Sequence, residues 1–389
     1  MTDASSAGMA DSMPSGVVVA AAAGDLPVEP PADEPQRHTA WQLLVQARSC
    51  AAMGSPLYGH LLERAAADCG AGGPTWAVLR DHVTPGRGDA LALRLMAAVH
   101  RLVLERRAPH LATFYPSVGG TGALDGVWEA FRATLVDHAG DLAPLVGRPC
   151  QTNEVGRSAA LLIGLFAVAR HTGLPLRLRE VGASAGLNLR CDRFLVGGGG
   201  VTVGAPDSPV DLSSHWRAPP PWTPAPLDVV DRRGCDRAPV DPTTTDGRLT
   251  LTASVWADQR ERHARLRGAL ELARQVPAEV DHASLEDWTR AQLVDLPDGA
   301  ATVVLHSVVL EYVDAAERAA FVDALREAGA RATADRPLAW VRLEPISDLR
   351  HHGVQVDLWP DGSSRTLARC GAHGTDVAWL GDDNTAVRG

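Results

Sequence analysis

The spacing of hydrophobic residues divides the chain into two parts. Between residues 38 and 171, apolar side chains recur every three or four positions, which is the spacing of one face of an α-helix. The clearest such run covers 90–107, with Leu91, Leu95 and Leu102 on one face. The same pattern predicts helices over 41–48, 57–69, 128–145 and 156–171. We therefore predict a helical domain over 38–171 and expect it to bind the substrate.

From residue 172 the pattern becomes one of strands that alternate with helices. Short apolar or alternating runs predict strands at 176–181, 229–233, 279–282, 302–309, 338–344, 354–359 and 376–380, and helices are predicted over 249–274 and 315–330. Such alternation is typical of a mostly parallel sheet covered by helices. The expected fold class is α/β, with a Rossmann-like sheet domain over 172–389 that follows the all-helical domain.

One stretch, residues 177–189 with the sequence RLREVGASAGLNL, organises this second part. It predicts a strand, a turn of small residues and the start of a helix at 187–189. Glycine at 182 and 186 permits backbone conformations that other residues avoid, and it lets a ligand approach the backbone closely. The dinucleotide fingerprint G-x-G-x-x-G is not met, because Ser184 occupies its second glycine position.

The stretch resembles motif I of the class I S-adenosylmethionine-dependent methyltransferases, in which an acidic residue precedes a loop of small residues. The resemblance implies that S-adenosylmethionine is the cofactor and that the loop faces its methionine half. A tight turn of an ordinary α/β domain is the alternative. The residues that the resemblance assigns to the cofactor are Glu180, Gly182, Ala183, Ser184, Gly186 and Asn188.

In the same methyltransferases an acidic residue at the end of the second strand binds the ribose hydroxyl groups. Asp236 is the candidate here, with Asp231 and Asp241 as rivals. The gap from the first strand is longer than usual because a segment rich in glycine and proline, residues 197–226, lies between. We interpret this segment either as a lid over the cofactor or as a disordered insertion.

Two polar islands interrupt the helical part. The first, FYPSVGGTG at 114–122, is a glycine-rich loop that carries Tyr115 and Ser117. The second, QTNEVGRS at 151–158, contains Asn153, Glu154 and Arg157. Helix capping by the second island and an ion pair between its Glu154 and Arg157 are the structural alternatives to a role in substrate binding.

His306 lies at the carboxyl end of the buried run 302–309 and is the candidate general base. A histidine that is hydrogen-bonded within the core is the alternative. Glu154 and Tyr115 are further catalytic candidates. For substrate binding we select Asn153, Arg157, Ser117, Tyr312 and Glu344. No metal is predicted, since the histidines at 351 and 352 are adjacent and H-E-x-x-H is absent.

Composition limits the partners and the compartment. The chain has 389 residues and a formal net charge of −10, so a broad nucleic-acid surface is not expected, although a local basic groove remains open. The six cysteines form no C-x-x-C pair, which indicates a reduced, cytoplasmic protein. Residues 1–37 are interpreted as a disordered tail without a signal peptide or membrane span. The oligomeric state is not predicted.

A second resemblance covers roughly residues 40–380. The combination of YPSVGG, QTNEVGRS, REVGASAGLNL, LHSVVLEY and RLEP resembles a bacterial family of a domain of unknown function. Residues 306–309 read HSVV instead of the Asn/Asp-Pro-Pro-aromatic motif of enzymes that methylate the amino groups of nucleic-acid bases, so such a substrate is disfavoured. Three functions remain: a methyltransferase for a small-molecule acceptor, a methyltransferase-like protein that binds a metabolite without turnover, and another nucleotide-using α/β enzyme.

Overall fold

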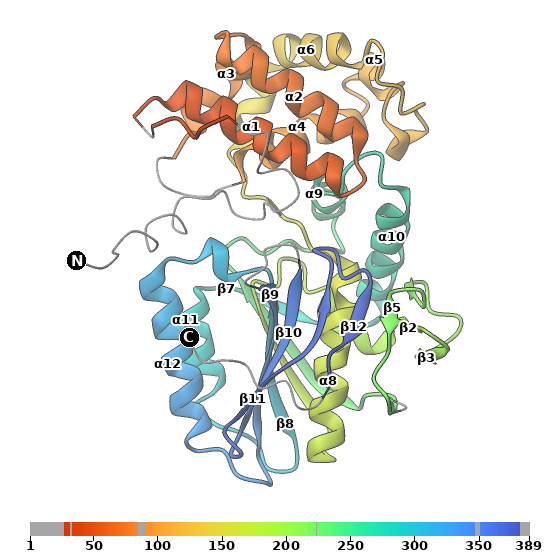
Figure 1. Ribbon diagram of the computed structural model, residues 1–389, viewed down its shortest axis with the longest axis vertical. Helices are drawn as coiled ribbons and strands as arrows, with labels where there is room; N and C mark the ends of the chain where they lie inside the picture. The colour runs from red at the N-terminus through yellow and green to blue at the C-terminus, as the bar shows by residue number, and fades with distance from the viewer. Residues whose placement is uncertain (1–26, 32, 85–89, 223, 347–350, 382–389) are drawn as a thin grey trace, which may run out of the picture. The chain divides into compact units, whose positions relative to one another are not determined.

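The computed structural model describes residues 27–31, 33–84, 90–222, 224–346 and 351–381 (Figure 1). The chain divides into two compact units. The first combines Met1–Thr152 with Leu249–His263, and the second combines Asn153–Arg248 with Ala264–Gly389. Together they form a mixed α/β protein with a helical N-terminal region and one large sheet, as the hydrophobic spacing predicted.

The first unit is helical. Its α-helices are α1 (Pro35–Ala52), α2 (Pro56–Gly70), α3 (Pro74–Leu79), α4 (Leu91–Leu104), α5 (Pro109–Ala112), α6 (Val127–Asp137) and α7 (Ala139–Val146). Apolar faces of these helices meet in one core, to which α4 contributes Leu95, Val99 and Leu102. The single helix predicted over 128–145 is instead the pair α6 and α7, because the chain leaves helical geometry at His138.

A segment from the second half of the sequence completes this unit. Helix α9 (Thr245–Ser254) ends within it, and α10 (Arg260–Gln275) begins within it. The Asp258 carboxylate accepts hydrogen bonds from Ser55 Oγ at 2.6 Å and from Leu57 N at 3.0 Å, at the first turn of α2. Trp256 lies in the helical core. The prediction that 249–274 is largely helical is confirmed, although residues 255–259 leave the helix to make these contacts.

The second unit is built on a nine-stranded sheet with the order β5-β12-β11-β10-β9-β8-β1-β6-β7. Strands β7, β6, β1, β8 and β9 are parallel to their neighbours, and β10, β11 and β12 continue from β9 as antiparallel strands. The bounds are β1 (Leu176–Val181), β6 (Val229–Asp236), β7 (Glu279–His282), β8 (Ala301–Ser307), β9 (Leu338–Pro345), β10 (His352–Trp359), β11 (Ser363–Cys370) and β12 (Val377–Trp379).

Helices cover both faces of this sheet (Figure 1). Helix α8 (Ser158–Thr172) packs on β8 to β11, while α11 (Leu285–Gln292) and α12 (Ala315–Gly329) pack against each other on the opposite face. Gly164 of α8 makes close packing possible, because a Cβ atom there would meet Val341 at 2.5 Å. Helix α8 was predicted to close the helical domain, but it belongs to the sheet unit, so the division falls at residue 152 instead of 171.

The segment predicted as a lid or a disordered insertion is folded. Strands β2 (Leu195–Gly198), β3 (Val201–Val203) and β4 (Asp211–Leu212) form a small separate sheet, and β5 (Trp216–Ala218) joins the large sheet beside β12. Trp216 is buried and its Nε1 donates to Ala159 O at 2.8 Å. Burial of this tryptophan fixes the segment to α8, so the interpretation as a disordered insertion is wrong, while the lid stays a prediction.

The predicted disordered tail falls largely outside the described residues, since residues 1–26 are not among them. The part that is described lies against α1: Trp41 Nε1 donates to Pro27 O at 2.9 Å. Helix α1 then begins at Pro35, two residues before the predicted end of the tail. Among the described residues, no helix is long and apolar enough to cross a membrane.

Candidate functional site

The strand order reverses at the centre of the sheet. The chain passes from β1 to β6 on one side, and the later strands β8 and β9 lie on the other side of β1. Ligands of open α/β sheets bind outside the carboxyl ends of the strands at such a reversal. The turn that follows β1 is therefore the expected position of a ligand. A cavity of about 530 Å³, lined by Leu174, Gly299 and Arg336, lies at the opposite edge, before β1, β8 and β9.

The turn after β1 has an unusual backbone. Gly182, Ser184 and Gly186 have φ values of +63°, +54° and +64°. Left-handed backbone is costly for a residue with a Cβ atom, so the two glycines suit their positions and Ser184 is strained. A Cβ atom on Gly182 would also come within 2.5 Å of Val309 Cγ2. The small residues seen in the sequence are thus required by the path of the backbone and by a close neighbour.

Backbone N–H groups of the turn are held by its own unit. Ala183 N donates to Cys235 O at 2.9 Å, and Leu187 N donates to Asn153 Oδ1 at 2.9 Å. The predicted helix after the turn is only η5, a short 3₁₀ segment over Asn188–Arg193. Hence the prediction that an α-helix begins at 187–189 is wrong. A ligand would be recognised by side chains and by the narrow shape of the turn.

Glu180 lies beneath this turn, near the carboxyl end of β1. Its side chain is buried, with 2% of the residue exposed, and its Oε2 has no hydrogen-bond partner in the part of the chain that the structure describes. Burial raises the pKa of Glu180 to about 8, although a hydrogen bond from Asn188 and the charge of Arg190 act in the opposite direction. A buried carboxyl oxygen without a partner is energetically costly, which makes Glu180 a candidate ligand-binding group.

Asp236 ends β6, directly beside the turn. Its Oδ2 accepts from Ser184 N at 2.8 Å and its Oδ1 accepts from Ala238 N at 2.8 Å. Each carboxylate oxygen can accept a second hydrogen bond. These contacts therefore orient the carboxylate and leave it able to accept further hydrogen bonds. The rivals are engaged elsewhere: Asp231 forms ion pairs with Arg177 and Arg179, and Asp241 accepts from Thr243.

The second polar island supports the turn. Asn153 holds Leu187 N, as described above, and Ser158 Oγ donates to Asn188 Oδ1 at 2.8 Å. Glu154 is buried, and its Oε1 accepts from Gly156 N at 3.1 Å as the cap of the short helix η4 (Val155–Arg157). The island therefore lies at the candidate site, and its capping residue is Glu154 instead of the expected Thr152 or Asn153.

Arg157 donates to backbone carbonyl groups instead of pairing with Glu154, and its role in substrate binding stays a prediction. Its Nε donates to Ala372 O at 3.0 Å and its Nη1 donates to Ser307 O at 3.3 Å. The guanidinium thus connects the end of β8 to the segment between β11 and β12. Arg157 is half-buried at this place and its role there is that of a structural bridge.

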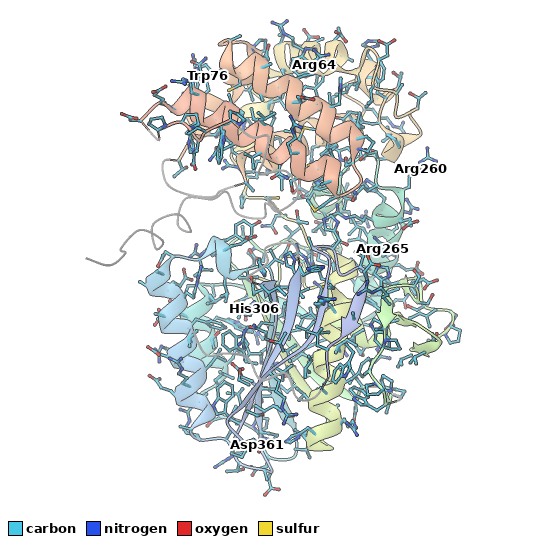
Figure 2. All side chains as sticks on the ribbon, in the orientation of Figure 1. Arg64, Trp76, Arg260, Arg265, His306 and Asp361 are labelled. Carbon is cyan, nitrogen blue, oxygen red and sulfur yellow. The ribbon has the colours of Figure 1, made fainter. Side chains whose placement is uncertain are left out.

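His306 is enclosed within the sheet unit (Figure 2). It has no exposed surface; Nδ1 lies 2.8 Å from Glu344 Oε1, and Nε2 accepts from Trp340 Nε1 at 3.0 Å. Because the indole is a donor only, Nδ1 carries the proton that is donated to Glu344. Both ring nitrogens are occupied, which is the arrangement of a core histidine and leaves no nitrogen to take a proton from an acceptor.

Glu344 is the charged partner of this pair. Its Oε1 also accepts from Val309 N at 3.0 Å. Burial favours the neutral acid, but hydrogen bonds from His306, Val309 and Leu310 outweigh burial and lower the pKa of Glu344. These contacts all engage Oε1, so they orient the carboxylate toward the segment after β8, and the role of Glu344 in substrate binding stays a prediction. Tyr312, in the same segment, is exposed to 44%.

Tyr115 and Ser117 belong to the first unit. The Tyr115 ring is fully buried in the helical core, 5.5 Å from the ring of His100, and its hydroxyl has no partner among the residues described. Ser117 Oγ lies 2.8 Å from His100 Nε2. The loop 114–122 therefore contributes to the interior of its own unit. The sequence alone does not reveal this burial of Tyr115, and the binding and catalytic roles of Tyr115 and Ser117 stay predictions.

Sequence reasoning missed Arg190 and Ser158. Arg190 is buried, and it donates to Gly186 O at 2.6 Å and to Val276 O at 2.7 Å, so it fixes the turn to the segment that precedes β7. The signal was its position four residues after Gly186 in a buried stretch. Among the described residues, no group of three or more histidine, cysteine, aspartate or glutamate side chains could hold a metal ion.

These features define the class: an α/β chain with a helical unit and a sheet unit whose tight turn follows the central parallel strand. A family model matches residues 40–379, and the chain belongs to that family, described as "Uncharacterized protein conserved in bacteria (DUF2332)". No curated protein and no solved structure matches the chain. Family membership explains the shared motifs, and the activity has to be argued from the site.

Proposed function

We propose that the chain is an S-adenosylmethionine-dependent methyltransferase that acts on a small-molecule acceptor. The observation that carries the proposal is Glu180, a buried acid with an unpartnered oxygen, beneath a turn of positive φ at the reversal of the strand order. A neutral or charged carboxyl at this place would bind the ammonium group or another polar atom of the methionine half. The parallel order β7-β6-β1-β8-β9 supports the same assignment.

The remaining cofactor contacts follow from the positions of the side chains. Asp236 keeps lone pairs free at the end of β6 and would accept hydrogen bonds from the two ribose hydroxyls. Gly182, Ala183 and Gly186 would leave room for the methionine chain. Methyl transfer joins the methyl carbon to an oxygen or nitrogen of the acceptor, breaks its bond to sulfur and releases the thioether and one proton.

The proton would go to Glu154, the candidate base nearest the turn that remains after His306 is assigned to the core. A carboxylate at the start of η4 lies next to Asn153, which contacts the turn directly. We place the acceptor on this side of the turn. Glu154→Gln should then lower turnover by about 10²-fold or more while cofactor affinity stays near that of the wild type.

Calorimetry tests the cofactor. We expect S-adenosylmethionine and its demethylated product to bind with a dissociation constant near 1 µM, about −8 kcal/mol, and NAD and ATP to show no binding. Glu180→Gln should weaken binding about 10-fold or more. Gly182→Val is the weaker test, since its side chain would strain the turn against Val309 in any case. Absence of binding by the folded wild-type protein would reject the proposal.

A second candidate function is binding of the same metabolite without turnover. The occupied ring of His306 favours it, since the histidine best placed by the sequence to act as a base is held in the core. Release of the demethylated product during incubation with a broad set of hydroxyl and amine metabolites separates the two functions. Cofactor binding without product from any acceptor would favour the binding protein.

A further inference from the structure

One face of α10 carries an unusual charge pattern. Leu270, Glu271 and Arg274 lie three, four and seven residues after Arg267, so the four residues share one side of the helix. With Arg248 of α9 and Gln275 they line a cavity of about 580 Å³. Leu270 is buried and forms an apolar floor, whereas Arg267 and Arg274 are exposed. We call these six residues the arginine groove.

Two arginines of the groove, Arg267 and Arg274, are unpaired among the residues that the structure describes. Neither Arg267 nor Arg274 forms an ion pair or side-chain hydrogen bond within the described part of the chain. Glu271 has helical ion-pair spacing to both, yet it joins neither. Other arginines of the sheet unit are paired: Arg232 with Asp192 and Arg342 with Asp357.

We propose that the arginine groove binds a small ligand that carries a diphosphate group. Three guanidinium groups and one carboxylate leave a net charge of +2 around the cavity. Arg267 and Arg274 are separated by about 10 Å along the helix axis, and their long side chains can converge on one anion. Guanidinium groups bind phosphate oxygens through paired hydrogen bonds.

Size and charge favour a small molecule over a nucleic acid. A nucleic acid needs an extended basic surface, but the chain carries a net charge of −10 and only three arginines line the groove. A cavity of this volume lies within the range of small-molecule sites. The buried Leu270 would contact an apolar or aromatic part attached to the diphosphate.

The groove is separate from the candidate cofactor site. None of its lining residues belongs to the turn after β1, to Asp236 or to the island at 151–158. It ends at Gln275, and the next residue, Val276, accepts the hydrogen bond from Arg190 that also holds Gly186. A ligand in the groove would therefore adjoin the support of the turn without occupying it.

Calorimetry of the full chain with inorganic pyrophosphate tests the proposal. Arg267→Ala and Arg274→Ala should each weaken binding about 10-fold or more, and the double variant should abolish it. Arg267→Lys should keep the charge but lose part of the affinity, because lysine cannot form the paired hydrogen bonds. Affinity should also fall as salt is raised.

Arg260→Ala is the matched control, since Arg260 is an exposed arginine of the same helix, outside the groove and without a partner among the described side chains (Figure 2). It should bind pyrophosphate as the wild type does. Equal weakening by Arg260→Ala, or no binding by the wild type, would overturn the proposal. Glu180→Gln should retain pyrophosphate binding, which keeps this result independent of the proposed methyltransferase. Thermal melting confirms that each variant is folded.

Discussion

Glu180 and Glu344 lie toward the carboxyl ends of two parallel strands in the same sheet, β1 and β9, yet their surroundings differ. Glu344 accepts hydrogen bonds from His306 and Val309, and its pKa is lowered. Glu180 has a free Oε2, and burial raises its pKa to about 8. The sequence gives both residues the same position in the βα pattern. The comparison shows that partners supplied by other segments decide the direction in which the pKa of each buried acid is shifted.

The largest expected effect on stability comes from removing the hydrogen-bonded pair of His306 and Glu344. His306→Ala leaves the Glu344 carboxylate and the Trp340 indole without their buried partner, and we expect it to lower the free energy of unfolding by about 3–5 kcal/mol. Chemical denaturation measures this loss. Wild-type stability combined with lost turnover would contradict the core assignment and return His306 to the role of base.

The two acids should respond oppositely to pH. Because the pKa of Glu180 is raised from 4.5 to about 8, its contribution to stability is present below pH 4.5 and is lost as the pH rises toward 8. Because the pKa of Glu344 is lowered, its contribution is present at neutral pH and is lost as the pH falls below 4.5.

Denaturation of Glu180→Gln and Glu344→Gln from pH 4 to 8 measures this difference. Relative to wild type, Glu180→Gln should become more stable by a few kcal/mol as the pH rises, since the variant has no charge to bury. Glu344→Gln should be least stable, relative to wild type, at neutral pH. Parallel pH profiles for the two variants would show that the acids are not distinguished by their environment.

A smaller effect is expected from the support of the turn above Glu180. Asn153→Ala removes the acceptor of Leu187 N and should lower the free energy of unfolding by about 1 kcal/mol. Affinity for the demethylated cofactor should fall in the same variant. Tyr312→Ala, at an exposed position, serves as the control and should change stability by less than about 0.5 kcal/mol. If Asn153→Ala and Tyr312→Ala change the free energy of unfolding equally, the island at 151–158 does not support the turn.

The smallest effect is expected at Ser184. Its φ of +54° is favourable for glycine, so Ser184→Gly relieves strain while it raises the entropy of the unfolded chain. The two contributions nearly cancel, and we expect stability within about 0.5 kcal/mol of wild type with cofactor affinity unchanged. Calorimetry and thermal melting check both values. A large loss of affinity would mean that the Ser184 side chain itself binds the ligand.

The sequence by itself determined the elements that depend on local pattern. Periodic apolar residues gave the helical region and the α/β alternation, and the glycines at 182 and 186 marked the turn after β1, where φ is positive. Local rules succeed here because helix periodicity and backbone freedom are properties of neighbouring residues. The placement of Glu180 at the end of the central strand was predictable for the same reason.

Only the tertiary structure decided which candidate side chains remain free. Trp340 and Glu344 occupy both nitrogens of His306 from 34 and 38 residues away, and Ala372 engages Arg157 across 215 residues. Burial of Trp216 attaches the segment rich in glycine and proline, which pairs with β12 of the large sheet through β5. Hydrogen bonding and burial depend on partners that are distant in the chain, and no local pattern encodes which partners will meet.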